Sequence, residues 1–253
     1  MDQPDSDGFI VIRAKGRRQR KPKTKAQHHG KAQNSLFSTS AEHHDPRQVT
    51  RHIEAVSDKK STLCQGAFHE KLAAILQALH DFGPEETVVY GIGTFSSEQS
   101  QWQLALVLLL NQTLNTRILA YDPVLSSNDL AVLAHFDIET ISENEQARRT
   151  AQRRTLFYMP HCERELYENV VDANNNSAAQ LEMIAILGNR LSRYIDVDNG
   201  QLARVSPSLC RVLPKLTTME LPDEKLLCLR HRPFAFSDTC FQRILAPTSS
   251  AVA

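Results

Sequence analysis

The sequence lacks a long hydrophobic run and a cysteine pattern of the kind that binds metals. Its longest apolar stretch, Leu104–Leu110, is far shorter than the about 20 residues that a helix needs to cross a bilayer. No apolar signal segment is present, and the five widely spaced cysteines include no C-x-x-C pair. An odd number of unpaired cysteines favours a reducing compartment. We therefore expect a soluble intracellular protein without a membrane partner.

The sequence also lacks net charge, but the zero total conceals two regions of opposite sign. Residues 1–60 carry 13 Lys/Arg and 7 Asp/Glu, whereas residues 61–253 carry 16 and 22. Residues 13–31 hold nine basic residues and no acidic one, a composition too charged to fold alone. We expect residues 1–60 to be a disordered basic tail and residues 61–253 to form a single domain, best defined over 61–200.

One segment of the tail, residues 17–23, has the composition of a nuclear-import signal or a nonspecific nucleic-acid contact. The residues that would carry import are Arg17, Arg18, Arg20 and Lys21. The segment has no aromatic residue, which disfavours recognition of single strands by base stacking. A tail that only increases solubility is the alternative.

From residue 61 onward, strand and helix patterns alternate. Short β-branched or apolar runs predict strands at 87–90, 116–121, 138–141, 155–159 and about 181–187, the last being either a strand or a helix start. Helical spacing or polarity predicts helices at 68–79, 97–111, 126–136, 145–153 and 163–171. This alternation predicts an α/β fold: a three-layer, Rossmann-like, mostly parallel sheet with helices on both faces. Residues 200–253, broken by prolines, give no clear pattern.

A polar or small residue follows each predicted strand. In a parallel sheet these strand ends converge on the edge where ligands bind. The sequence therefore predicts one shared pocket for a small nucleotide-like ligand. The candidate ligand-binding residues are Gly91, Gly93, Thr94, Ser96, Asp122, Glu143, Asn144, His161, Gly188 and Asn189.

The glycine loop after the first strand is the strongest local signal. Gly91 and Gly93 would let the backbone approach a ligand, and the start of the next helix could hold an anion. The pattern is not G-x-G-x-x-G, since Ser96 stands at the third glycine position, so a tight turn capped by Ser96 or Ser97 is the alternative. Asp122 stands where nucleotide-binding sheets place an acid on a ribose hydroxyl, with an Asp-Pro turn as its alternative.

His161 and Cys162 suggest a metal or a nucleophile. No second Cys/His group lies at ligand spacing, however, and the sequence offers Cys162 no base partner. A histidine that bonds within its own loop is the commoner case, and we expect no metal. Glu143 could act as a general base, although a solvated loop acid is commoner. Catalytic residues and cofactor therefore stay unassigned.

Several of these strand ends together resemble one family, the "sensitivity to red light reduced" domain of plants, fungi and animals. The resemblance covers about residues 60–200 and lies in segments 89–97, 103–106, 121–124, 144–145, 157–162, 166–169 and 187–189. It implies a regulator in cytoplasm and nucleus, with circadian-clock input in plants and links to haem biosynthesis and clock-gene expression in animals. It implies no established catalysis.

Two departures limit what the resemblance implies. Residues 144–147 read Asn-Glu-Gln-Ala, where the family tends to have a second acid and a glycine, so an intact acid-base site there is in doubt. The chain has no Cys-Pro dipeptide, so direct haem sensing has no support in the residues.

Three functional readings remain. The first is a non-enzymatic regulator whose sheet edge binds a small ligand or an unidentified protein partner. The second is a nucleotide-cofactor enzyme, such as an S-adenosylmethionine-dependent methyltransferase, with Gly91 and Gly93 beside the cofactor and Asp122 on its ribose. The third is a scaffold with a vestigial pocket. The resemblance favours the regulator, because fold alone does not decide function.

Overall fold

The computed structural model describes residues 44–194, 201–229 and 234–244, all of which belong to one compact unit. The expected tail lies largely outside the described residues. The same is true of the candidate import residues Arg17, Arg18, Arg20 and Lys21.

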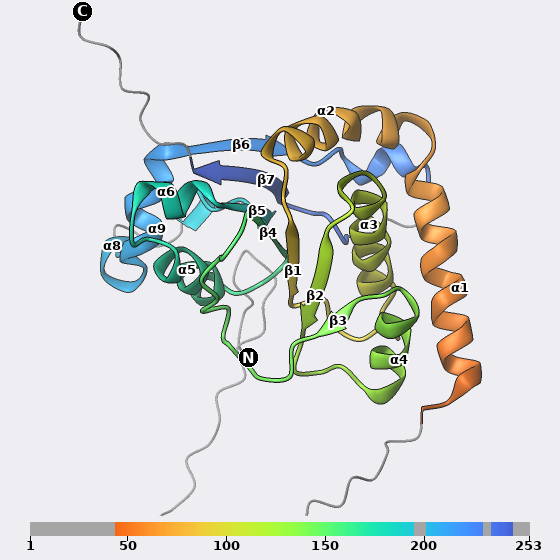
Figure 1. The fold of residues 1–253 in the computed structure, drawn as a ribbon. Helices are drawn as coiled ribbons and strands as arrows, with labels where there is room; N and C mark the ends of the chain where they lie inside the picture. The colour runs from red at the N-terminus through yellow and green to blue at the C-terminus, as the bar shows by residue number, and fades with distance from the viewer. Residues whose placement is uncertain (1–43, 195–200, 230–233, 245–253) are drawn as a thin grey trace, which may run out of the picture. The chain divides into compact units, whose positions relative to one another are not determined.

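The unit is built on a seven-stranded sheet with the order β3-β2-β1-β4-β5-β7-β6 (Figure 1). The strands are β1 Glu86–Tyr90, β2 Arg117–Tyr121, β3 Glu139–Thr140, β4 Thr155–Met159, β5 Ile184–Asn189, β6 Leu216–Glu220 and β7 Thr239–Ile244. The first five are parallel, and β7 runs antiparallel to both β5 and β6. The predicted α/β class and mostly parallel sheet are confirmed.

The central strands β1 and β4 are buried along their whole length. Strands covered on both faces read as continuous apolar runs, because successive side chains enter opposite cores. Val89 and Tyr158 enter one core, while Val88 and Phe157 enter the other. Strand order reverses between β1 and β4, so this boundary is the switch point of the sheet, where ligands usually bind.

Helices cover both faces of the sheet (Figure 1). One face carries α1 Pro46–Leu63, α2 Gly66–Phe82, α3 Glu98–Leu114 and α4 Ser127–His135. The other carries α5 Arg164–Ala173, α6 Ala178–Glu182, α8 Leu202–Val205 and α9 Pro207–Val212. Two short 3₁₀ turns, η1 Leu213–Lys215 and η2 Glu224–Leu227, join the later elements.

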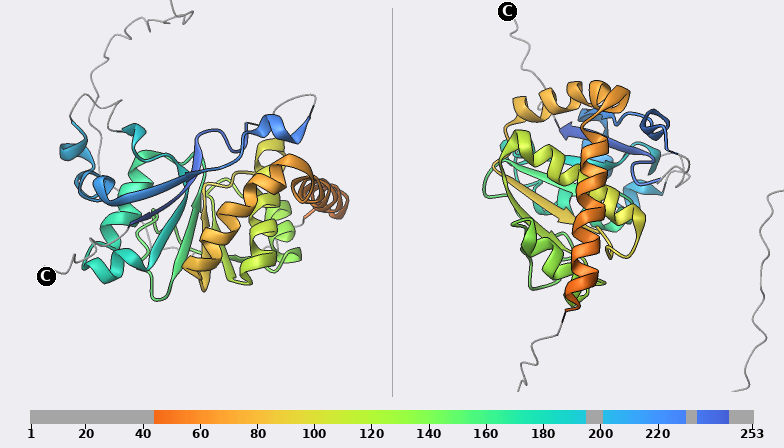
Figure 2. Two further views of the ribbon diagram at one scale, coloured as in Figure 1. Left: turned by 90° about the horizontal axis from the view of Figure 1, so that it is seen from above. Right: turned by 90° about the vertical axis from the view of Figure 1, so that its right-hand side faces the viewer.

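Helix α1 corrects the expected boundary of the tail. Residues 46–60, which we expected to be disordered, form most of a helix that packs along α3 and α4 (Figure 2, right). Its buried residues are Val49, Val56 and Leu63, a stripe too narrow to stand out in a polar sequence. Because α1 covers the side of α3 that faces away from the sheet, every residue from Trp102 to Leu110 is buried.

The segment between β3 and β4 differs from the prediction. We expected a polar helix at 145–153, but the chain there is irregular. Gln146 and Ala147 both have left-handed backbone angles, with φ of 49° and 57°, which a right-handed helix does not admit. The other predicted helices and strands are present, with ends shifted by a few residues, and the ambiguous stretch near 181–187 contains a short helix, α6, followed by β5.

Candidate functional site

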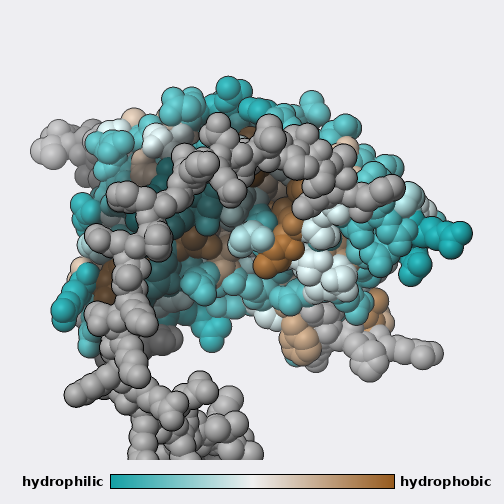
Figure 3. Space-filling model, turned by 90° about the horizontal axis from the view of Figure 1, so that it is seen from below, coloured by the Kyte–Doolittle hydropathy of each residue, from teal (hydrophilic) through white to brown (hydrophobic). Residues whose placement is uncertain are grey.

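The candidate site is the edge of the sheet at the carboxyl ends of β1, β2, β4 and β5, which we call the rim. It comprises residues 91–97, Asp122, residues 161–162 and residues 188–189. Figure 3 views the unit from this side, where polar and apolar side chains lie next to one another. Strand register brings these ends level, since Val89 pairs with Tyr158 and Met159 with Gly188.

Asp122 closes the glycine loop. Its Oδ2 accepts a hydrogen bond of 2.8 Å from the Gly93 amide, and its Oδ1 accepts one of 3.0 Å from the Val124 amide. Gly93 has φ of 73°, and a Cβ there would lie 2.7 Å from the Ser100 Oγ. The loop therefore needs glycine at this position, and both the predicted proximity of Gly93 to Asp122 and the turn-forming role of Asp122 are observed.

A second carboxylate, Asp129 on α4, also holds the glycine loop. The sequence did not indicate this role. The side chain is fully buried, and its Oδ1 accepts from the Phe95 amide at 2.8 Å and from the Thr94 hydroxyl at 3.3 Å. Its Oδ2 accepts from the amide and hydroxyl of Ser126, completing a capping box at the start of α4. The spacing Ser126-x-x-Asp129 was a visible capping signal, but nothing in it pointed to the β1 loop.

The serines of the loop lie at its outer side. Ser96 is exposed, and its Oγ lies 3.1 Å from the Thr94 Oγ1. Ser97 is the N-cap residue of α3, although its side chain makes no capping hydrogen bond. Of the two predicted capping residues, the structure thus selects Ser97, and Thr94 is engaged by Asp129.

Cys162 lies under the other glycine of the loop. A Cβ on Gly91, whose φ is 71°, would lie 2.5 Å from the Cys162 Sγ, and the thiol donates to the Tyr90 carbonyl at 3.4 Å. Burial raises the pKa of the Cys162 thiol to about 12, with smaller contributions from the charges of Asp122 and Glu163. The thiol is therefore protonated at neutral pH and packs as a small buried group, which disfavours a nucleophilic role.

His161 and Asn189 join the ends of β4 and β5. The His161 amide donates to the Asn189 Oδ1 at 2.7 Å, and the Asn189 Nδ2 donates to the Cys162 carbonyl at 3.1 Å. The His161 ring extends to another segment, with its Nε2 at 3.0 Å from the Ala235 carbonyl oxygen. The His161 ring therefore contacts the backbone of a distant segment, whereas the alternative to a metal ligand predicted a bond within its own loop.

Gly188, at the β5 end of the rim, is buried. A Cβ there would lie 2.7 Å from the Tyr167 Oη and 2.9 Å from the Met159 carbonyl oxygen. The Tyr167 hydroxyl donates to that same carbonyl and accepts from the Asn189 amide at 2.8 Å. Gly188 therefore makes room for Tyr167, a packing role that its place after an apolar run did not indicate.

Glu143 and Asn144 are exposed in the loop after β3. The Asn144 Oδ1 accepts a hydrogen bond of 2.9 Å from the Gln146 amide. Across residues 44–194, 201–229 and 234–244, no hydrogen bond connects either side chain to Gly93, Asp122 or His161. The structure thus brings together the ends of β1, β2, β4 and β5, and leaves the β3 end apart from that bonded group.

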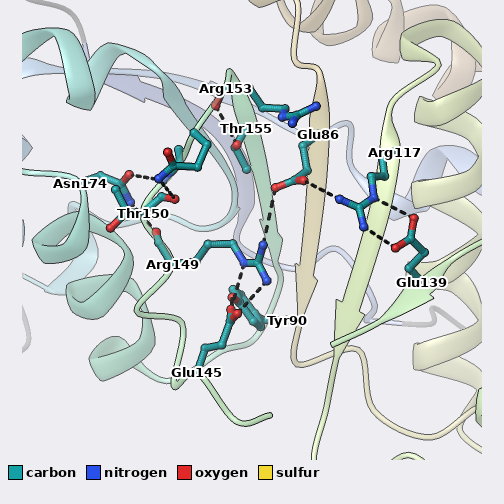
Figure 4. Close-up of polar contacts among 12 residues, drawn as sticks. Glu86, Tyr90, Arg117, Glu139, Glu145, Arg149, Thr150, Arg153, Thr155 and Asn174 are labelled. Atoms are coloured by element: carbon teal, nitrogen blue, oxygen red, sulfur yellow. Dashed lines mark hydrogen bonds and ion pairs between the residues drawn. The ribbon is translucent and has the colours of Figure 1, made fainter. Parts of the chain in front are cut away.

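A chain of charged contacts attaches the irregular β3–β4 segment to the sheet (Figure 4). The Tyr90 hydroxyl donates to the Glu145 Oε2 at 2.6 Å, and Arg149 donates to both oxygens of Glu145, at 2.7 and 3.0 Å. Arg149 and Arg117 lie on either side of Glu86, at 3.8 and 3.7 Å. Burial raises the pKa of the Tyr90 hydroxyl, and the hydrogen bond to Glu145 and its negative charge raise it further. Glu145 therefore anchors Tyr90, the last residue of β1, and is not a free base.

Within the described part of the chain, no group of three or more His, Cys, Asp or Glu side chains is placed to hold a metal ion. None of the described helices is both long enough and apolar enough to span a membrane.

Comparison with known proteins places the chain in a family. A family model described as the SRR1 domain matches residues 64–243, which is well over half of the chain. The chain belongs to the SRR1 domain family. This membership supports a regulatory protein and confirms the resemblance seen in the sequence.

Two curated relatives and one solved structure are similar to the chain. The Arabidopsis thaliana protein SENSITIVITY TO RED LIGHT REDUCED 1 is 39% identical over 113 residues, covering 43% of this chain and 41% of the relative. A mouse SRR1-like protein is 36% identical over 132 residues, covering 47% and 53%. The chain thus spans about half the length of the curated relatives it matches.

The solved structure is an SAH-bound methyltransferase from Podospora anserina. It is 12% identical to the chain, with a TM-score of 0.37, and the match covers 86% of this chain and 100% of the other. The likeness concerns the fold alone.

Proposed function

We propose that this protein is a non-enzymatic regulator whose rim binds a small ligand or a protein partner. One observation carries the proposal: the groups of the rim that could do chemistry are already engaged by the chain itself. Asp122 and Asp129 accept backbone amides, and His161 contacts a backbone carbonyl. Cys162 is protonated beneath Gly91. Among the rim residues that the structure describes, no pair of a free base and an activated nucleophile is assembled, which supports binding over catalysis.

The same bonds support a preformed binding surface. The loop of residues 91–97 is fixed by two carboxylates, so its exposed backbone is rigid before any ligand arrives. A rigid surface binds with a smaller loss of entropy than a flexible one. The position at the switch point of the sheet supports a small nucleotide-like ligand. Its identity is not specified by these contacts.

The biological process that we propose follows the family. It is circadian-clock input, with links to haem biosynthesis and clock-gene expression, in cytoplasm and nucleus. Nuclear entry would use Arg17, Arg18, Arg20 and Lys21. Alanine at these four positions should lower nuclear accumulation while leaving the melting temperature unchanged, and an unaltered nuclear level would contradict the assignment.

The regulatory proposal is tested by rescue of cells depleted of the protein. Clock-reporter rhythm and haem synthesis are measured after re-expression of the wild type, of Asp122→Ala, and of Asp81→Asn as a control at an exposed acid on α2. We expect the wild type and Asp81→Asn to restore both readouts and Asp122→Ala to fail at equal protein level. Equal rescue by all three variants would contradict a functional rim.

A cofactor-binding enzyme is the second candidate, and one observation favours it. Asp122 directly follows β2 and lies beside the glycine loop, at the place where nucleotide-binding sheets put an acid on a ribose hydroxyl. Against it, both carboxylate oxygens of Asp122 already accept backbone amides. S-adenosylmethionine or its demethylated product should raise the melting temperature if this reading holds, and Asp122→Ala should abolish the rise. A flat thermal-shift screen would support the regulator.

A further inference from the structure

The sheet ends in two edge strands, β3 and β6, and the chain protects them unequally. Strand β3 has only the two residues Glu139–Thr140, and Glu139 forms a bidentate pair with Arg117. Strand β6 has the five residues Leu216–Glu220, in unbroken register with β7. Shortness, charge, proline and bulges are the features that keep natural edge strands from pairing with other chains. Strand β3 has the first two, whereas β6 has one charged residue, Glu220, and neither a proline nor a bulge.

The outer edge of β6 carries backbone groups that the sheet does not use. Strand β6 lies at the upper margin of the sheet in Figure 1, and within the described residues no strand pairs with its outer side. The Leu221 amide donates to the Thr239 carbonyl at 3.1 Å, in the register of the β6–β7 pair. Because bonding alternates along an antiparallel ladder, the odd-numbered residues of β6 bond to β7. The even-numbered residues turn their backbone groups outward: Leu216, Thr218 and Glu220.

The side chains of β6 suit a paired strand. Leu216 and Met219 are half-buried, and each packs against a different one of the two cores. The two threonines between them are exposed. Threonine and apolar residues are common in paired strands. Glu220 forms an ion pair with Arg190, so β6 has no uncompensated charge that would repel a neighbouring strand.

Strand β6 is complementary to itself under two-fold symmetry. In the antiparallel register centred on Thr218, every outward-facing residue meets an outward-facing residue of the second copy. Each of the two neighbouring registers instead sets one of them opposite Pro214 or Pro222, which have no amide hydrogen. The pairs in the centred register are Thr218 with Thr218, Thr217 with Met219, and Leu216 with Glu220.

The charges at the ends of β6 agree with this register. Lys215, directly before Leu216, is exposed and has no ion pair within the described residues. In the two-fold pair, Leu216 lies opposite Glu220 of the second copy, so Lys215 comes next to that carboxylate. A Lys–Glu contact therefore forms at each end of the paired strands, and no like charges face each other.

We propose that β6 pairs with β6 of a second copy of this chain, so that the two sheets form one continuous sheet across a two-fold axis. The inference goes beyond the proposed function, because the interface contains no residue of the rim. A strand pair of this length is smaller than a standard interface of about 1,600 Å². We therefore expect a weak dimer, with a dissociation constant on the order of 10 µM.

The test is sedimentation velocity of the full-length chain at concentrations from about 1 to about 200 µM, which bracket that constant. Wild type should dimerise as the concentration rises. Thr218→Lys and Thr218→Glu should each weaken the dimer about tenfold or more, because like charges then face each other at the two-fold axis. An equimolar mixture of the two variants should dimerise at least as well as wild type. Thr140→Lys, the same change at an exposed position of β3, is the control and should dimerise like wild type.

A proline variant tests the direction of the backbone. Thr218→Pro removes an outward amide without breaking a bond to β7, so it should abolish the dimer and leave the urea midpoint of the monomer close to that of wild type. Thr217→Pro removes an amide that faces β7 and should lower that midpoint. Equal midpoints for the two proline variants would overturn the assignment of the outward edge. Should neither variant fold, the charge variants decide by themselves.

Three outcomes would overturn the proposal. The first is a wild type that stays monomeric over the whole range, and the second is a mixture of Thr218→Lys and Thr218→Glu that stays monomeric. The third is a dimer that persists unchanged in Thr218→Lys, since it would place the interface on another surface. If wild type is monomeric and a chain ending at residue 244 dimerises, the chain's own last residues cover β6 in place of a second copy.

Discussion

The glycine loop and residues Phe234–Phe236, which we call the strap, border the same switch point, yet the chain holds them by different means. Two carboxylates fix the loop, since Asp122 and Asp129 accept hydrogen bonds of 2.8 Å from the backbone amides of Gly93 and Phe95. Neutral amides hold the carbonyls of Phe234 and Ala235 at 3.3 and 3.4 Å. Charge-assisted bonds are about twice as strong as neutral ones. The comparison teaches that charge-assisted hydrogen bonds fix one border of the site, whereas burial of Ala235 and Phe236 contributes most to fixing the other.

Removal of the buried carboxylate under the loop should have the largest effect. Asp129→Ala leaves the Phe95 amide and the first turn of α4 without their acceptor, so we expect the free energy of unfolding to fall by about 4 kcal/mol. Urea unfolding measures the change. Asp129→Asn should lose less, and the exposed control Asp81→Asn should lose nothing measurable. A loss below about 1 kcal/mol for Asp129→Ala would show that the loop does not depend on this acid.

A side chain at Gly93 should have the next largest effect. Gly93→Ala must adopt φ of 73° and places a Cβ 2.7 Å from the Ser100 Oγ, so we expect a loss of about 2 kcal/mol in the free energy of unfolding. In a Ser100→Ala background the close approach disappears and about 1 kcal/mol should remain for the backbone strain. An equal cost in both backgrounds would contradict the close approach as its source.

Alkaline pH should weaken the loop through Cys162. Burial raises the pKa of this thiol from its ordinary value of 9.0 to about 12, so the unfolded chain ionises first. The stabilising contribution of the protonated Cys162 thiol is complete below pH 9 and is lost as the pH rises toward 12. From pH 8 to pH 10, wild type should therefore lose about 1 kcal/mol more than Cys162→Ala. Parallel loss in the two proteins, followed by urea unfolding at each pH, would show that the thiol is not buried beneath Gly91.

Loss of a strap contact should have the smallest effect. Gln99→Ala removes one long neutral hydrogen bond at an exposed position, so we expect a fall of about 0.5 kcal/mol in the free energy of unfolding. The strap should nevertheless become more accessible to limited proteolysis. A loss as large as that of Asp129→Ala would remove the distinction between the two borders.

Much of the fold was accessible from the sequence, because its signals are local. The β1 run stops at a glycine turn, Ser126 caps α4 after Asp-Pro, and Gly83 ends α2 with φ of 60°. Such features act over a few residues and can be read without tertiary information.

The missed elements depend on distant contacts. Helix α1 buries a narrow stripe against α3, and the irregular β3–β4 segment is fixed by the pairing of Arg149 with Glu86. The short strands β6 and β7 follow a proline-broken stretch and pair with each other and with β5. Tertiary packing overrides local propensity in such places.

The sequence predicted which residues of the candidate site lie close together, but not the role of each side chain. Position after a strand correctly placed Gly93 beside Asp122 and His161 beside Asn189. It could not show that Gly188 accommodates Tyr167, or that Asp129 supports the loop from a different helix. Those roles arise from contacts between residues far apart in the sequence, which periodicity does not encode.

Hydrogen exchange read by mass spectrometry on the unmodified full-length protein tests the central claim most directly. The peptide that contains Gly93 and Phe95 should exchange only at the rate of global unfolding, while the peptide that contains Phe234 and Ala235 should exchange much faster, through local opening. Equal protection of the two peptides, or faster exchange at the glycine loop, would contradict a switch point with one more strongly and one more weakly hydrogen-bonded border.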